Sequence, residues 1–324
     1  MNVAVLGGAG ELGSSFAKLC IDRGYKVKII DLTRKLEAWR LNWLGIADKV
    51  NYVWKSTFDL EEQDVEADLI LDAACQADRP LGTSSPRYTL QNNLLGPLTL
   101  LERVSRLPTP DRPTIIYPSS CVEFLGVPRG EQPITERTVP KPTNIYGWSK
   151  FASEELYLTY HRAFQLPCMI IRTGSCFGPG MRTDQMVAQV TVKCLRNESI
   201  LVRSPRATRS YTFTEDVMDF YRLLLDRFES DPAALNGLIL SNGGNAENKP
   251  YETLEVARMI RELTQSRSEL IEGGYEPGEL IDGRPVFQWE SSELAFKLLG
   301  WKPKTTLREG LEKTIRWFKD WKYA

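Results

Sequence analysis

The start of the chain constrains the fold most, because a short apolar run is followed at once by closely spaced glycines. The run Asn2–Leu6 (NVAVL) has the composition of a β-strand, and the stretch 11–23 has the amphipathic pattern of a helix. Gly7 and Gly10 lie between them, and Gly13 lies in the first turn of the expected helix. Glycines at such a junction let the backbone approach a bound group closely and let the helix pack against the sheet. We therefore expect a strand, a tight ligand-binding loop and a helix at the start of the fold.

An alternation of strands and helices continues along the chain. Short apolar runs of strand composition alternate with longer amphipathic stretches as far as about residue 174. Strands separated by helices predict a parallel sheet with helices on both faces, which is the doubly wound α/β arrangement, or Rossmann fold. The helices expected after the first one are 34–45, 88–106, 146–164, 213–228 and 305–322.

The length of the chain favours two domains, because 324 residues exceed the ~100–200 that one domain usually contains. Glycine and proline are concentrated at 174–180, 241–250 and 273–285, where the chain is expected to cross into a second region. We expect a cofactor-binding Rossmann domain and a smaller C-terminal α/β domain that binds the substrate. The first comprises residues 1–174 and about 213–241, and the second comprises about 175–212 and 242–324.

An acidic residue at the end of the second apolar run indicates which cofactor binds. Asp31 lies 18 residues after Gly13, about where a carboxylate accepts hydrogen bonds from the ribose of a bound adenosine. Its charge would repel the 2′-phosphate of NADP, so the expected cofactor is NAD, although Arg34 and Lys35 add positive charge nearby. The alternative is a tight turn in which the aspartate is only a capping residue.

Tyr146 and Lys150 are the candidate catalytic pair. They are four residues apart in the expected helix 146–164, so both side chains lie on one face of it. The lysine ammonium can lower the pKa of the phenol from its reference value of about 10 and help to hold the nicotinamide ribose. A tyrosinate can then act as the base. The alternative is an ordinary pair of side chains on a solvated helix face.

Composition argues against several other classes of protein. The chain has 41 basic and 42 acidic residues and no Lys/Arg block, so it lacks the charge pattern of a nucleic-acid-binding protein and a small-molecule partner is expected. Six scattered cysteines without a C-x-x-C pair, and a single histidine, predict neither a disulfide framework nor a metal site. No apolar run approaches ~18 residues, and no room is left for a signal peptide. We expect a soluble, cytoplasmic protein without a membrane segment or a metal.

Taken in order, the motifs resemble those of the extended short-chain dehydrogenase/reductases, in particular the NAD-dependent nucleotide-sugar epimerase and dehydratase family. The glycines match its G-x-x-G-x-x-G loop, and Tyr146 and Lys150 match its Y-x-x-x-K pair. Further matching segments cover nearly the whole chain. They are FDL (58–60), LDAACQA (71–77), NNLLGPLTLLE (92–102), RTGSCFGPG (172–180), RSYTFTEDV (209–217) and LGWKPKTTLREGLEKTIRWFK (299–319).

The resemblance implies a hydride-transfer mechanism. Tyr146 would take the proton of a sugar hydroxyl while bound NAD accepts hydride from the same carbon, which gives a transient keto sugar. Arg209 would bind the diphosphate of a nucleotide sugar. The other implied substrate-binding residues are Ser175, which replaces the family's asparagine, Arg182 and Arg284. The implied cofactor-binding residues are Gly7, Gly10, Glu11, Leu12, Asp31, Asp59, Leu60, Ala73, Ala74, Asn93, Tyr146 and Lys150.

The loop YPSSCVEFLG (117–126) holds the third catalytic group, because the family places a Ser or Thr from this loop beside the tyrosine. Alignment on the strand selects Ser120, whereas alignment on Gly126 puts Cys121 in the hydroxyl position. A hydroxyl is the better donor, so Ser120 ranks first. Cys121 ranks second, in an auxiliary or structural role or as an acid/base like the cysteine of related GDP-sugar enzymes, and Ser119 ranks third. The alternative for Cys121 is a buried, inert thiol.

Glu123 bears on the choice of reaction. Related dehydratases have Asp-Glu here, an acid and a base in series, whereas this loop has Val122 and Glu123, which argues against 4,6-dehydration. Related decarboxylases also keep a Glu in this loop. They need cationic groups for the carboxylate of a uronic acid, and the candidates are Arg172, Arg182 and Arg206.

The expected function is a nucleotide-sugar epimerase that acts through a transient keto sugar with bound NAD. The segment TRKLEAWRLNWL (33–44) and Ser175 are similar to CDP-tyvelose 2-epimerases. The alternatives are a nucleotide-sugar dehydratase or uronic-acid decarboxylase of the same family, and a non-catalytic member that binds NAD and a nucleotide. The resemblance also implies a homodimer, in which helices 88–106 and 146–164 meet their copies in a four-helix bundle.

Overall fold

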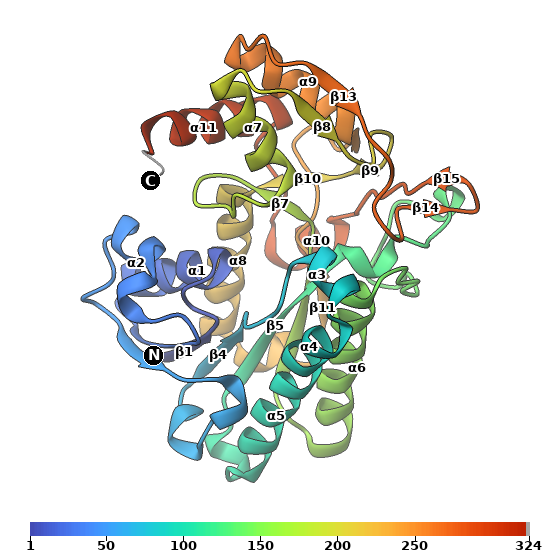
Figure 1. Cartoon of the computed structure of the whole chain (residues 1–324). Coiled ribbons are helices and arrows are strands. Elements are labelled where there is room, and N and C mark those ends of the chain that lie inside the picture. The colour runs from blue at the N-terminus through green and yellow to red at the C-terminus, as the bar shows by residue number, and fades with distance from the viewer. Residues whose placement is uncertain (322–324) are drawn as a thin grey trace. The chain divides into compact units, whose positions relative to one another are not determined.

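A computed structural model describes residues 1–321 of the chain (Figure 1). Its main sheet has seven strands in the order β11-β6-β5-β4-β1-β2-β3. The pairs β1–β2, β1–β4, β2–β3 and β4–β5 are parallel, and the expected doubly wound sheet is confirmed. The strands are β1 (Asn2–Leu6), β2 (Lys26–Asp31), β3 (Asn51–Trp54), β4 (Leu69–Asp72), β5 (Thr114–Ser120), β6 (Cys168–Thr173) and β11 (Ile239–Ser241).

The central strands of this sheet are buried, as their sequences require. All four residues of β4 (LILD) and all seven residues of β5 (TIIYPSS) are buried. Continuous burial is typical of parallel strands that helices cover on both faces. The carboxyl ends of β4 and β5 carry Asp72, Ser119 and Ser120, and ligands of open α/β sheets bind at this edge.

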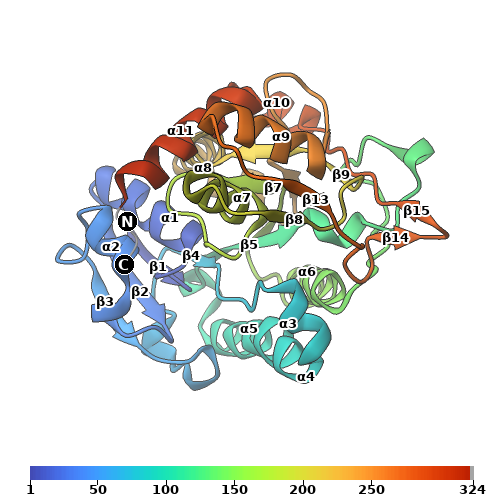
Figure 2. The ribbon, with the colours of Figure 1, turned by 45° about the horizontal axis from the view of Figure 1, so that its top comes forward.

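Helices cover both faces of the sheet. Figure 2 shows α1 on one face and α5 and α6 on the other. The expected helix 88–106 is interrupted, because a π-helix over Gln91–Leu95 separates α4 from α5. The helices that pack around this sheet are α1 (Glu11–Asp22), α2 (Trp39–Trp43), α3 (Arg79–Ser84), α4 (Pro86–Leu90), α5 (Gly96–Arg106) and α6 (Ile145–Phe164).

Contacts within the chain define two compact units. Unit 1 comprises residues 1–120, 144–172 and 221–240, and unit 2 comprises residues 121–143, 173–220 and those from 241 onward. The sequence places 121–143 in the first domain, whereas its contacts group it with unit 2. One of these contacts is the hydrogen bond from the Ile134 nitrogen to the Trp289 oxygen, 2.7 Å long. Helix α8 (Thr214–Ser230) contributes residues to both units.

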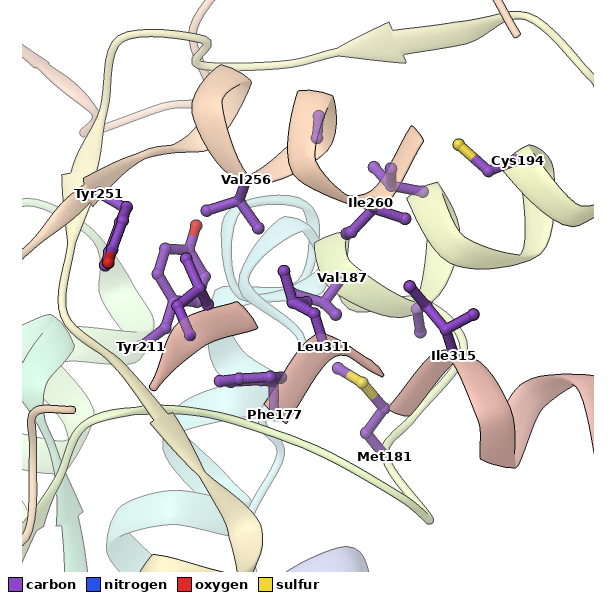
Figure 3. Packing of buried hydrophobic residues seen from close by; sticks show 14 of the residues in the cluster. Phe177, Met181, Val187, Cys194, Tyr211, Tyr251, Val256, Ile260, Leu311 and Ile315 are labelled. Carbon is purple, nitrogen blue, oxygen red and sulfur yellow. The ribbon is translucent and has the colours of Figure 1, made fainter. Parts of the chain in front are cut away.

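Unit 2 has a hydrophobic core of its own, between α7, α9 and α11. Figure 3 shows Val187, Ile260 and Leu311 from these three helices pointing toward one another, and all three side chains are buried. Thr306 caps the N-terminus of α11, and its hydroxyl accepts a hydrogen bond from the Glu309 nitrogen in a capping box. The helices of unit 2 are α7 (Met186–Arg196), α9 (Thr253–Thr264), α10 (Glu293–Leu299) and α11 (Leu307–Asp320).

Short strands and single helical turns complete the fold. The strands of unit 2 are β7 (Ser175–Phe177), β8 (Ile200–Val202), β9 (Thr208–Arg209), β10 (Tyr211–Phe213), β12 (Tyr251–Glu252), β13 (Leu270–Glu272), β14 (Leu280–Ile281) and β15 (Arg284–Pro285). Turns of 3-10 helix lie at Lys35–Glu37, Thr57–Asp59, Glu62–Asp64, Thr109–Asp111, Cys121–Phe124, Arg129–Glu131 and Pro232–Leu235. Within residues 1–321, none of the helices has the length and apolar character needed to cross a membrane.

Candidate active site

The glycine loop between β1 and α1 is closed too tightly for side chains. Gly7 has a positive φ of 72°, and a Cβ atom on it would lie 2.7 Å from the Ala74 nitrogen. A Cβ atom on Gly13 would overlap the carbonyl oxygen of Gly7. The loop is held by a hydrogen bond from the Gly10 nitrogen to the Gly7 oxygen, 3.1 Å long. The spacing of the three glycines is therefore a steric requirement of this loop.

Asp31 is fixed at the carboxyl end of β2 by two backbone donors. Its Oδ2 accepts a hydrogen bond from the Ala9 nitrogen at 2.9 Å, and its Oδ1 accepts one from the Thr33 nitrogen at 2.8 Å. The carboxylate thus connects the glycine loop to the end of the next strand. Each of its oxygens retains a second lone pair, which can accept a hydrogen bond from a ligand hydroxyl.

A cavity of about 310 Å³ lies within unit 1 beside these groups. Five of the predicted cofactor-binding residues line it, namely Gly7, Gly10, Asp31, Ala73 and Ala74. The other lining residues are Ala9, Ile30, Leu32, Thr33, Arg40, Lys55, Thr57, Cys75, Gln76, Tyr88 and Asn92.

Asp59 ends the 3-10 turn Thr57–Asp59, and Leu60 follows it directly. Neither lines the cavity, although Thr57 in the same turn does. Leu60 is buried in the core of unit 1, and its carbonyl oxygen accepts a 2.6 Å hydrogen bond from Arg103. The predicted Glu11 and Leu12 lie in the first turn of α1 and do not line the cavity either.

Asn93 lies in the π-helix and connects three segments of unit 1. Its side chain exchanges two hydrogen bonds with the backbone of Gln76, 2.7 and 2.9 Å long. Its side-chain amide also donates to the Ser149 hydroxyl at 3.0 Å, and its backbone carbonyl oxygen accepts a hydrogen bond from the Ser153 hydroxyl. Asn93 is buried and does not line the cavity, so it holds α6 against the loop after β4.

Lys150 points into a buried aromatic cluster of unit 1. Its ammonium nitrogen lies 4.1 Å from the centre of the Tyr117 ring, and that ring stacks on Tyr157 at 4.5 Å. The Tyr157 hydroxyl donates to Oδ2 of Asp72. Burial raises the pKa of Asp72, whereas the hydrogen bond from Tyr157 and the charge of Lys150 oppose this rise. Tyr146, one turn before Lys150 on α6, is partly exposed.

The loop after β5 divides its predicted catalytic residues between the units. Ser119 and Ser120 end β5 in unit 1, whereas Cys121 and Glu123 belong to unit 2. Cys121 is buried, and its Sγ lies 3.9 Å from the Ser175 hydroxyl. Burial, and secondly the charge of Glu290, raise the pKa of this thiol well above its ordinary value. Cys121 is therefore a neutral thiol and not a thiolate at neutral pH.

Four of the five arginines considered for anion binding face carboxylates of the chain itself. Within unit 1, Arg172 and Glu154 are both buried and their side chains are 2.6 Å apart. Within unit 2, buried Arg209 pairs with Glu279, and Arg182 pairs with Asp184. The other two are more exposed: Arg206 lies near Glu252 and Glu272, and Arg284 lies on β15.

Comparison with known proteins assigns the family. The model of the NAD dependent epimerase/dehydratase family matches residues 3–236. The chain belongs to this family. Its members depend on NAD, so the predicted family and cofactor are confirmed.

Individual relatives match along the whole chain. The dTDP-glucose 4,6-dehydratase of Xanthomonas campestris pv. campestris (strain B100) is 26% identical over 336 residues, which cover 97% of this chain and 92% of the relative. The UDP-glucuronic acid decarboxylase 3 of Arabidopsis thaliana is 26% identical over 327 residues, with coverages of 96% and 87%. The crystal structure of UDP-glucuronic acid 4-epimerase from Bacillus cereus in complex with UDP-glucuronic acid and NAD has a TM-score of 0.86, at 20% identity and 99% coverage of both chains. This likeness confirms the fold.

The cavity of unit 1 fits the cofactor of the family. The glycine loop presents backbone without side chains, and Asp31 presents acceptors at the end of β2. Phosphates bind where backbone N–H groups at a helix N-terminus are accessible, and ribose hydroxyls donate to a carboxylate. Gly7, Gly10 and Asp31 are therefore the residues of this chain that would hold NAD most directly.

Several residues that line the cavity were not predicted individually. Gln76 lies within the matching segment LDAACQA (71–77), so its position carried a signal. Arg40, Lys55 and Tyr88 also line the cavity, but each lies in a segment that carries no cofactor signal. Glu290 was missed because only its burial in unit 2 distinguishes it from an ordinary surface glutamate.

Proposed function

We propose that the chain is a nucleotide-sugar epimerase that works through a transient keto sugar. The observation that carries this proposal is the buried ammonium of Lys150, on the same helix as Tyr146 and in the unit that contains the glycine loop. When bound, NAD supplies a hydride acceptor. Tyr146 takes the proton of the sugar hydroxyl, the positive charge of Lys150 stabilises the resulting tyrosinate, and Ser120 donates a hydrogen bond to the tyrosine.

Two features support epimerisation over the related reactions. The loop after β5 has Val122 before Glu123, so it lacks the paired acid and base that a 4,6-dehydration uses. The candidate cations for a uronate, Arg172, Arg182 and Arg206, each face a carboxylate of the chain. A uronic-acid decarboxylase would have to separate such a pair before it could bind the carboxylate of its substrate.

The test is turnover of a panel of UDP-, CDP-, GDP- and dTDP-sugars, followed by proton NMR. An epimerase gives a new anomeric signal from a sugar of unchanged mass. The product of a dehydratase shows the methyl signal of a deoxy sugar, and the product of a decarboxylase is lighter than its substrate by the mass of carbon dioxide. Finding either product would contradict the epimerase proposal. If no sugar in the panel is turned over, the chain is a non-catalytic family member.

The hydroxyl partner of Tyr146 is tested by comparing Ser120→Ala with Cys121→Ala. We expect a rate loss of about 10²-fold or more in the serine variant, because it removes a donor to the reacting tyrosine. The cysteine variant should retain most of the rate. A large loss in the cysteine variant alone would reverse this assignment.

We also propose that the chain forms a homodimer through α5 and α6 with the segment before α5. Tyr88 and Leu95 are 49% and 46% exposed, and Trp148 and Phe164 on α6 are 45% and 52% exposed. Large apolar side chains on neighbouring helices are suited to an interface between copies. The test is sedimentation of the wild type and of Leu95→Glu. A monomeric wild type would contradict the proposed dimer, and a Leu95→Glu variant that is still dimeric would contradict the proposed interface. The cytoplasm remains the predicted location.

A further inference from the structure

The cavity of unit 1 carries charges of both signs on its wall. Among residues 1–321, one acidic side chain and two basic side chains line it, namely Asp31, Arg40 and Lys55. A carboxylate at the end of β2 favours a free ribose hydroxyl, whereas an arginine nearby accommodates a 2′-phosphate. The choice between NAD and NADP therefore depends on the two cations as well as on Asp31.

The charge of Lys55 is balanced within its own segment. Its ammonium nitrogen lies 3.0 Å from Oε2 of Glu61 and 2.7 Å from Oδ2 of Asp64. Asp64 is buried, so the second pair is partly shielded from water. The attraction of a cation for a distant anion is largely cancelled when two carboxylates lie next to that cation. Lys55 is therefore not the group that determines the response of the cavity to an added phosphate.

Arg40 is held at the cavity wall by the fold of α2. Its neighbour Leu41 is fully buried and anchors this short helix in the core. The guanidinium carbon of Arg40 lies 4.4 Å from the centre of the Trp39 ring. An aromatic ring attracts and orients a guanidinium group but leaves its positive charge in place. Arg40 thus presents an oriented cation to the cavity that also contains Asp31.

The basic residues that directly follow β2 are placed elsewhere. Arg34 and Lys35 are exposed and do not line the cavity. The guanidinium of Arg34 lies over the ring of Trp54, 5.1 Å from its centre. The sequence suggests these two cations as the ones that weaken a preference for NAD, whereas the structure brings Arg40 to the cavity instead.

We propose that Arg40 is a second determinant of cofactor choice: its charge partly offsets that of Asp31, and its guanidinium would bind the 2′-phosphate of NADP. Charges act on each other over about 8–10 Å at physiological ionic strength, and both side chains line one cavity of about 310 Å³. A guanidinium can donate two parallel hydrogen bonds to phosphate oxygens. The cavity should therefore prefer NAD but still accept NADP. This inference concerns the cofactor and holds whichever reaction the chain catalyses.

The test compares the binding of NAD and NADP, which differ only in the 2′-phosphate. The full-length protein is freed of bound nucleotide and titrated with each by calorimetry. Arg40→Met keeps a long side chain and removes the charge. It should weaken NADP binding about tenfold or more and NAD binding by less than about threefold. Retained NAD affinity would show that the cavity is intact in this variant.

Asp31→Asn provides the opposite perturbation. It removes the repelling charge and should tighten NADP binding relative to NAD binding. Adding Arg40→Met to Asp31→Asn should remove most of this gain, because the cation that binds the phosphate is lost. If the wild type binds NADP too weakly for titration, the comparison of Asp31→Asn with the double variant decides the question.

Arg34→Met is the matched control, because it makes the same substitution at a cation outside the cavity. It should leave the ratio of the two dissociation constants unchanged. The proposal is overturned if Arg40→Met changes NAD and NADP binding by the same factor, or if Arg34→Met shifts the ratio as much as Arg40→Met does. None of these measurements uses a sugar substrate, so failure of the epimerase proposal would leave their outcome valid.

Discussion

The ammonium nitrogen of Lys150 lies 4.1 Å from the centre of the Tyr117 ring, and both side chains are buried. Burial alone disfavours a charged lysine, whereas the face of an aromatic ring attracts a cation. Tyr117 is supported in turn by Tyr157, which stacks on it and donates a hydrogen bond to Asp72. The aromatic cluster therefore holds the ammonium group of Lys150 over the Tyr117 ring, one helical turn from Tyr146.

Lys150→Met is expected to reduce turnover by about 10²–10⁴-fold, because it removes the charge that stabilises the tyrosinate. The folded structure should persist, since methionine fills a similar volume. The measurements are initial rates with the sugar identified in the panel and thermal unfolding by circular dichroism. Tyr117→Phe keeps the ring and is the matched control. A Lys150→Met variant with the wild-type rate would show that the lysine takes no part in the reaction.

Glu154→Gln is expected to destabilise unit 1 by about 3–5 kcal/mol, because it removes the buried negative charge that faces the guanidinium of Arg172. Replacing both residues by methionine should recover most of this loss, since an apolar pair leaves no charge unpaired. Urea unfolding at constant pH measures both effects. Equal losses in the single and the double variant would mean that packing, and not the unpaired charge, is responsible.

Asp31→Ala is expected to weaken NAD binding about tenfold to a hundredfold. The substitution leaves the nitrogens of Ala9 and Thr33 without their acceptor and removes the acceptor for the ribose, at a cost of about 1–3 kcal/mol. The preference for NAD over NADP should fall as well, because the repelling charge is gone. Titration calorimetry on cofactor-free protein measures both affinities. Unchanged affinities would place the adenosine elsewhere in unit 1.

Glu290 is expected to make stability depend on pH. Burial raises the pKa of Glu290 in the folded protein to about 7, above its ordinary 4.5, so the folded state holds this proton more tightly than the unfolded chain does. The contribution of Glu290 to the free energy of unfolding is therefore fully present below about pH 4.5. It is lost as pH rises through 7, and the total loss is about 3 kcal/mol.

Glu290→Gln removes this titration, so the variant should gain stability relative to the wild type between pH 5 and pH 8. Urea midpoints at the two pH values measure this difference. Glu293→Gln, at an exposed site, should show no such gain. If the urea midpoints of Glu290→Gln and the wild type differ by the same amount at both pH values, Glu290 does not change protonation in this range.

Local patterns were sufficient to predict the parts of the fold and site that depend on neighbouring residues. The glycine spacing reflects steric limits within one loop, and the placement of Tyr146 and Lys150 follows from the period of one helix. Asp31 was predictable because the end of a strand fixes its position beside the loop. These relationships lie within one loop, within one helix or within the β1-α1-β2 unit, where the sequence spacing determines the geometry.

The parts that could not be predicted depend on pairing between distant segments. Arg209 pairs with Glu279, 70 residues away, and Arg172 pairs with Glu154 on a different element. Such pairs have no period or spacing in the sequence, so the two arginines looked available for a ligand.

The π-helix at Gln91–Leu95 is the place in this segment where a change of length disturbs the fold least. A π-turn closes through i to i+5 hydrogen bonds and so holds one residue more than an α-turn. Deleting one residue here would give a continuous α-helix from Pro86 to Arg106 and, because both kinds of turn complete about one revolution, would leave Tyr88 on nearly the same side of the helix. The same deletion within α5 would rotate every residue beyond it by about 100° around the helix axis. Relatives should therefore differ in length at the π-turn more readily than in the helices on either side of it.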